Sequence, residues 1–248
     1  MANVLEENCS LRSLILNEND LGFAGAIDIA CALQMNAHLT RLDLSSNNIG
    51  YKGAIAFAKS LEANRVLSIL SLNGNAIGDE GGKAIASALV KNCSLLCLEV
   101  ANNDLSVEAG KYFASSLREN VCLTKLNLSS NKLGVEGGIA LATAIQKNTN
   151  LVELNLALNG VGGEGGLAIV EMLSHNTTLS WLFLGANSLS SAVDQRIQNA
   201  LKRNRHNRIT KARTLQHLCW ACIKSLHLDT FLLPPQMFLM YYNNDVYN

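Results

Sequence analysis

One spacing constrains this chain more than any other feature. Seven leucines follow one another 28 residues apart, and each opens a segment of the form L-x-x-L-x-L-x-x-N, with Val100 as the one substitution at the third leucine. The leucines are Leu11, Leu39, Leu67, Leu95, Leu123, Leu151 and Leu179. The closing asparagines are Asn19, Asn47, Asn75, Asn103, Asn131, Asn159 and Asn187. Such a fixed period predicts a stack of seven similar units that bury a continuous core between them.

The first half of each unit has the pattern of a short, half-buried strand. Leu42 and Leu44 are two residues apart, which puts both on one face, while Arg41, Asp43 and Ser45 face the other way. The asparagine follows where the chain turns off the strand, and its amide can both donate to and accept from backbone groups there. Stacked units would align these asparagines as a ladder.

The second half has the pattern of a helix. Between residues 50 and 64, Phe57, Ala58 and Leu61 fall on one helical face, and small residues around them allow close approach to the strands. A carboxylate recurs before or within the first turn, where the helix dipole favours negative charge. These carboxylates, which we interpret as structural rather than catalytic, are Glu80, Glu108, Glu136 and Glu164.

The units resemble the ribonuclease-inhibitor type of leucine-rich repeat over residues 11–207. The resemblance implies an α/β solenoid shaped like a horseshoe, with parallel strands inside and helices outside. Members of this class bind proteins, among them ribonucleases and the Ran GTPase, and similar arrays form the sensing part of intracellular immune receptors.

Residues 1–10 fall into the same register, since Leu5 lies 28 residues before Leu33 and Asn8 lies 28 before Asn36. They are expected to be the remnant of a preceding repeat helix. Solenoids usually shield their terminal repeats, and no N-terminal cap is recognisable. Either the remnant suffices, or the chain is a fragment or shortened isoform, which we favour.

The expected inner face is polar and mixed in charge. Its candidate target-binding residues are Arg41, Asp43, Glu99, Lys125, Glu153, Trp181 and Phe183. The two aromatic residues interrupt the polar pattern in the last repeat, and large exposed aromatics are common binding anchors. Alternatively, they pack under whatever follows the array.

Beyond residue 207 the sequence changes character, which predicts a second, small all-α module over residues 208–248. Leu215, Cys219 and Ile223 recur every four residues on an expected helix, and Thr214 is placed to cap its start. These four residues resemble the elongin-binding part of a SOCS box, (S/T/P)-L-x-x-x-C-x-x-x-Φ, where Φ is apolar. The alternative is a capping helix that closes the solenoid.

A second segment of the tail resembles the cullin-selecting part of the same box, L-P-Φ-P-x-x-Φ-x-x-Y. The matching residues are Leu233, Pro234, Leu239 and Tyr242. Pro235 and Gln236 stand where Φ-P is expected, which weakens the choice of a cullin more than the binding of elongin. The basic stretch over residues 202–208 is interpreted as a solvated helix end and linker.

Composition argues against several other classes. Twenty Lys and Arg balance twenty Asp and Glu, so no global field favours nucleic acid or a membrane surface. Seven cysteines in 248 residues form no disulfide framework, which indicates a reducing compartment, cytoplasmic or nuclear.

The apolar run from Phe231 to Tyr242 is too short to span a membrane. Cys219 and Cys222 lack the further ligands of a zinc site, and no cofactor motif or activated nucleophile is recognisable.

The leading hypothesis is a non-catalytic substrate receptor of a cullin-RING ubiquitin ligase. The repeats would hold a protein target, and the tail would dock on elongin B, elongin C and a cullin. The alternative is a scaffold or immune-receptor-like binding protein whose tail is only a cap. A GTPase activator resembling the Ran class is a third hypothesis.

Overall fold

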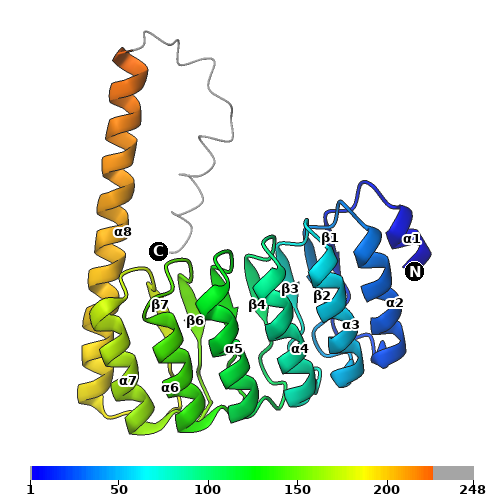
Figure 1. Ribbon diagram of the computed structural model, residues 1–248, viewed down its shortest axis with the longest axis horizontal. Helices are drawn as coiled ribbons and strands as arrows, with labels where there is room; N and C mark the ends of the chain where they lie inside the picture. The colour runs from blue at the N-terminus through cyan, green and yellow to red at the C-terminus, as the bar shows by residue number, and fades with distance from the viewer. Residues whose placement is uncertain (1, 226–248) are drawn as a thin grey trace. The chain divides into compact units, whose positions relative to one another are not determined.

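The computed structural model describes residues 2–225, and these divide into two compact units after Arg205. In the first unit, α1 is followed by alternating strands and helices (Figure 1). The strands are β1 (Ser13–Ile15), β2 (Arg41–Asp43), β3 (Ile69–Ser71), β4 (Cys97–Glu99), β5 (Lys125–Asn127), β6 (Glu153–Asn155) and β7 (Trp181–Phe183). The helices are α1 (Ala2–Glu7), α2 (Gly22–Met35), α3 (Gly50–Ala63), α4 (Gly78–Lys91), α5 (Val107–Glu119), α6 (Gly134–Ile145), α7 (Gly162–His175) and α8 (Ser191–Ser225).

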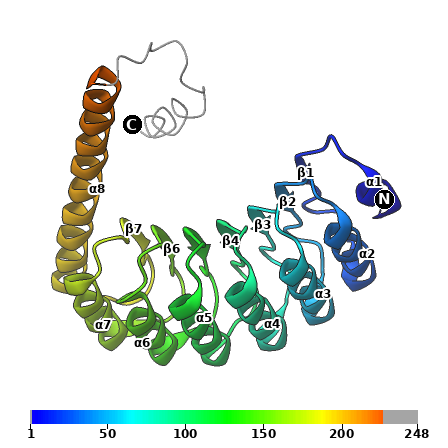
Figure 2. The same cartoon turned by 45° about the horizontal axis from the view of Figure 1, so that its top comes forward.

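The strands form one parallel sheet in chain order, and each pairs with the next at a shift of one repeat. Ser13 pairs with Arg41, for example, and Arg41 pairs with Ile69. The strands line the inner side of an arc, and α2 to α7 cover its outer side (Figure 2). This confirms the predicted α/β solenoid of parallel strands and helices.

The core lies between the two layers. The central leucines of β2, β3 and β4, which are Leu42, Leu70 and Leu98, are fully buried, and so are the helix residues Phe57 and Leu61. Small residues let neighbouring helices come close: a Cβ added at Gly81 would lie only 2.8 Å from the Cβ of Ala54. The predicted acidic residues Glu80, Glu108, Glu136 and Glu164 all lie in the first turn of their helices.

The asparagines that follow the strands join neighbouring repeats. The Oδ1 atom of Asn47 accepts from the backbone N–H of Asn19 at 3.0 Å, and its Nδ2 atom donates to the carbonyl of Leu16 at 2.8 Å. Both polar ends of the buried amide are thereby satisfied by backbone groups that the strand ladder does not use.

A second row of asparagines ends the helices, and the sequence pattern alone did not reveal its role. Asn64 Nδ2 donates to the carbonyl of Leu33 at 2.8 Å, while its Oδ1 accepts from the N–H of Leu67 at 2.7 Å. The buried members of this row are Asn36, Asn64, Asn92, Asn120, Asn148 and Asn176, whereas Asn204 holds the same register position inside α8. Each helix is therefore tied both to the preceding repeat and to its own next strand.

The first segment of α8 closes the last repeat. Val193, Ile197 and Leu201 are buried there, and Asn204 Nδ2 donates to the carbonyl of Leu179 at 2.8 Å. The boundary between the compact units falls after Arg205, whereas the predicted module boundary after residue 207 stays a prediction.

Two expectations were wrong. No helix begins at Thr214, because α8 continues through it and its Oγ1 donates to the carbonyl of Thr210 at 2.9 Å, one turn earlier. The basic stretch is not a helix end, because α8 continues through it to Ser225. Most of the stretch is exposed, as expected, but Arg205 is partly buried and donates to the carbonyl of Ser180, and Arg203 donates to the carbonyl of Leu173. Across residues 2–225, no helix is long and apolar enough to cross a membrane.

Candidate functional site

The candidate site is the face of the sheet that lines the inner side of the arc, which we call the strand face. The central residue is buried in β2 to β7 and half-buried in β1, and the first and third residues of each strand lie on the strand face. The seven predicted target-binding residues all occupy such first or third positions: Arg41, Asp43, Glu99, Lys125, Glu153, Trp181 and Phe183. Their role in binding stays a prediction.

The middle of the strand face is a polar network fixed by hydrogen bonds between repeats. Glu99 accepts from Ser71 Oγ and from Asn73 Nδ2, each at 3.0 Å. Lys125 Nζ lies 3.2 Å from a carboxylate oxygen of Glu153 in the next repeat. This arrangement holds the charges in place, but the exposed ion pair itself adds little stability.

Cys97 lies beside this network on the first position of β4. Its burial raises the pKa of the thiol from 9.0 to about 11, and the nearby Glu99 carboxylate acts in the same direction. The thiol therefore stays protonated near neutral pH, which is the opposite of what an activated nucleophile needs.

The end of the strand face at β7 is apolar. Trp181 and Phe183 are 48% and 47% exposed, and their partners in the preceding strand are Glu153 and Asn155. The guanidinium of Arg205 lies 4.8 Å from the centroid of the Trp181 ring, a cation–π contact. Arg205 thus stacks on the Trp181 ring, yet both aromatic side chains remain accessible.

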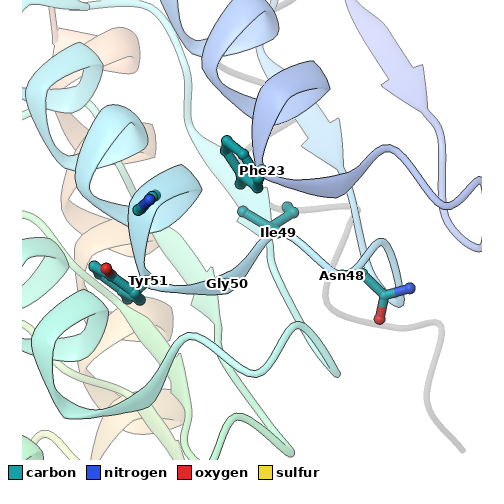
Figure 3. A pocket seen from close by; sticks show the side chains of 6 residues that line it. Phe23, Asn48, Ile49, Gly50 and Tyr51 are labelled. Atoms are coloured by element: carbon teal, nitrogen blue, oxygen red, sulfur yellow. The ribbon is translucent and has the colours of Figure 1, made fainter.

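A hollow lies at the start of α3, at the edge where the helices begin (Figure 3). Its volume is about 290 Å³, and Phe23, Ile49, Tyr51 and Lys52 contribute to its lining. Lys52 Nζ lies 5.3 Å from the centroid of the Phe23 ring. The hollow brings together none of the residues predicted for the site, and its one cation is already engaged by an aromatic ring.

The positions predicted to bind elongin all lie on α8. Thr214 is exposed on α8, and the backbone is helical through positions 215, 219 and 223, as the elongin-binding pattern requires. The predicted cullin-binding residues Leu233, Pro234, Leu239 and Tyr242 lie outside the described residues.

Comparison with known families gives one match, described as "Leucine Rich repeat". It covers residues 7–30, 36–58, 63–86, 91–114, 119–142 and 147–170, together more than half of the chain. No curated protein matches the sequence.

Two solved structures are similar in fold. One is described as leiomodin-1 actin-binding site 2, with 23% identity, a TM-score of 0.62, and coverage of 68% of this chain and 97% of the other. The second is the leucine-rich repeat-containing protein LegL7 from Legionella pneumophila, with 23% identity and a TM-score of 0.54. That match covers 79% of this chain but 64% of LegL7. At these identities the similarity shows the fold alone.

Proposed function

Because the chain belongs to the leucine-rich repeat family, we propose that it is a non-catalytic binding protein whose strand face holds a protein target. The observation that carries the proposal is the pair of half-exposed aromatic side chains, Trp181 and Phe183, at the end of a polar face fixed by hydrogen bonds. Exposed aromatics beside a rigid polar surface are typical of protein-binding anchors.

We further propose that the bound target is delivered to a cullin-RING ubiquitin ligase in the cytoplasm or nucleus. The support is the sequence pattern of Thr214, Leu215, Cys219 and Ile223, which falls on a helical stretch of backbone. Residues four apart on a helix project from one side, as insertion into a groove of elongin C requires. The protein would then act by bringing its target close to the charged ubiquitin enzyme.

The experiment is co-purification of the full chain with elongins B and C. The wild-type chain is expected to retain both elongins, whereas Leu215→Ala and Cys219→Ala each weaken the complex. Trp181→Ala is the control, because it alters the strand face and should leave elongin binding unchanged. Equal recovery of elongins with both tail variants, or no recovery with the wild type, would contradict the ligase proposal.

A further variant tests the predicted cullin-binding segment in the same co-purification. Replacing Leu233 and Pro234 together by alanine should reduce recovery of a cullin while the elongins remain bound. If cullin recovery does not change, the segment from Leu233 to Tyr242 does not select the cullin.

The scaffold alternative predicts binding without elongins. Actin is a useful partner to include, since the similar leiomodin-1 structure is described as an actin-binding site. Sedimentation with actin filaments, together with no recovery of elongins, would favour a scaffold over a ligase subunit.

A further inference from the structure

We propose that Leu158, Trp181, Phe183 and Arg205 form a single recognition patch, the terminal patch, for a protein segment that carries an apolar side chain next to an acidic one. The inference rests on the proposed binding role of the strand face. It adds the chemistry of the partner and two residues, Leu158 and Arg205, that the sequence did not single out.

The first support is the side chain at Leu158. Its φ is +57°, and a positive φ recurs at this position in every repeat, so the backbone conformation belongs to the turn that follows each strand. The other repeats hold small or polar residues there: Glu18, Ser46, Gly74, Asn102, Ser130 and Ala186. Leu158 is 55% exposed, so its side chain gains little from burial in the core. An exposed leucine where the other repeats hold small or polar residues extends the apolar surface at this end of the strand face.

The second support is the position of this leucine beside the aromatic pair. The N–H of Leu158 donates to the carbonyl of Gly185 at 2.9 Å. Gly185 lies two residues after Phe183, and therefore on the same side of the extended chain. A Cβ added at Gly185 would meet no atom within 4 Å. An open stretch of backbone therefore lies beside Leu158 and next to Phe183, and an incoming side chain can be buried there.

The charge of the patch indicates what flanks that side chain. Arg205 stacks on Trp181 and donates from one guanidinium nitrogen to the carbonyl of Ser180 at 2.9 Å. Among the described side chains it forms no ion pair, and the neighbouring Glu153 is paired with Lys125. A guanidinium has five N–H donors in a planar fork, which suits a carboxylate. The patch therefore fits an apolar anchor with an adjacent Asp or Glu.

The test uses a displayed library of short random peptides selected against the full chain. Selected peptides are expected to share an aliphatic or aromatic residue beside an Asp or Glu. Binding of a selected synthetic peptide can be followed by the fluorescence of Trp181 in the Trp220→Phe variant, since these are the two tryptophans of the chain. A blue shift of Trp181 emission is expected on binding. Selection of peptides without acidic residues, or no selection at all, would overturn the proposal.

Variants locate the binding and separate it from folding. Leu158→Ser and Phe183→Ser should each weaken the peptide roughly tenfold or more, as truncation of a central anchor does. Ile15→Ser is the matched control, because Ile15 holds the strand position of Phe183 in the first repeat and is 56% exposed. Arg205→Glu should reverse the preference, so that selected peptides carry Lys or Arg beside the apolar residue. An equal loss of peptide affinity with Ile15→Ser would show that the peptide does not bind at the terminal patch. Selection of acidic peptides by the Arg205→Glu variant would show that Arg205 does not determine the preference.

This outcome is independent of the ligase proposal. Loss of elongin binding with intact peptide selection would leave the terminal patch standing and refute the ligase role. Selected peptides that depend on Arg41 or Asp43, and not on Phe183, would support a binding strand face but overturn the terminal patch.

Discussion

The Oδ1 atom of Asn103 accepts a hydrogen bond of 2.9 Å from the backbone N–H of Asn75, one repeat earlier. Asn75 in turn donates from Nδ2 to the carbonyl of Leu44 at 2.9 Å. Each repeat thus satisfies buried backbone groups of its neighbour, and the same arrangement recurs in the row of asparagines that ends the helices. Stability in such an array is approximately a sum over repeats and the interfaces between them.

Asn92→Ala is expected to lower the free energy of unfolding by about 2–4 kcal/mol, because buried groups lose their partners. Asn92 donates to the carbonyl of Leu61 at 2.8 Å and accepts from the N–H of Leu95 at 2.8 Å. Urea unfolding followed by circular dichroism measures the change. Asn17→Ala is the control: Asn17 is exposed, and its loss should cost less than about 0.5 kcal/mol. Equal changes in the free energy of unfolding would show that the asparagines that end the helices contribute no more than an exposed asparagine does.

Glycine-to-alanine changes should have opposite signs at two helix positions. Gly81→Ala places a Cβ 2.8 Å from the Cβ of Ala54, so neighbouring helices must move apart, at a cost of about 1–3 kcal/mol. Gly163→Ala meets no atom within 4 Å and should stabilise α7 by about 0.4–1 kcal/mol. Thermal unfolding of the two variants beside the wild type checks both signs. Destabilisation by both changes would contradict the open space at Gly163.

Cys97 is expected to react slowly with alkylating reagents. Burial and Glu99 raise its pKa to about 11, so at pH 8 its thiolate fraction is about 100-fold lower than for a thiol of pKa 9. Peptide mapping by mass spectrometry should show early modification of the exposed Cys9 and Cys31 and late modification of Cys97. Early modification of Cys97 in the folded chain would contradict its burial.

The same pKa predicts a pH dependence of stability. The folded chain holds the Cys97 proton more tightly than the unfolded chain does. This contribution is therefore present in full below about pH 9 and is lost as the pH rises to about 11. Cys97→Ser should remove that part of the loss between pH 9 and pH 11. A wild-type and variant that lose stability in parallel over this range would contradict the prediction.

The repeat itself could be predicted from the sequence because its signals are local. The helix expected between residues 50 and 64 is α3, Gly50–Ala63, and the alternation of Arg41, Leu42 and Asp43 gave the buried and exposed sides of β2. One unit, repeated in register, is enough to place every strand beside the next.

The features that could not be predicted from the sequence depend on contacts between segments that are distant along the chain. Arg205 belongs to a basic run, and only the packing of α8 against the last repeat brings it to Trp181. Thr214 has the side chain of a helix cap, but residues 191–225 contain no glycine or proline to end the preceding helix. A local capping preference therefore did not decide where the helix begins. Leu158 could have been noticed as the large apolar residue at a position that holds Glu, Ser, Gly, Asn or Ala in the other repeats.

Site-specific photo-cross-linking tests most directly whether the strand face holds the target. A photoreactive phenylalanine analogue replaces Lys125 on the strand face in one variant and the exposed Ser87 of α4, on the helix side, in the other. Illumination of cells that express each full-length variant should give discrete cross-linked species from position 125 and none from position 87. Those species should disappear when Phe183→Ser is added. Cross-links from position 87 alone, or equal cross-links from both positions, would contradict binding through the strand face.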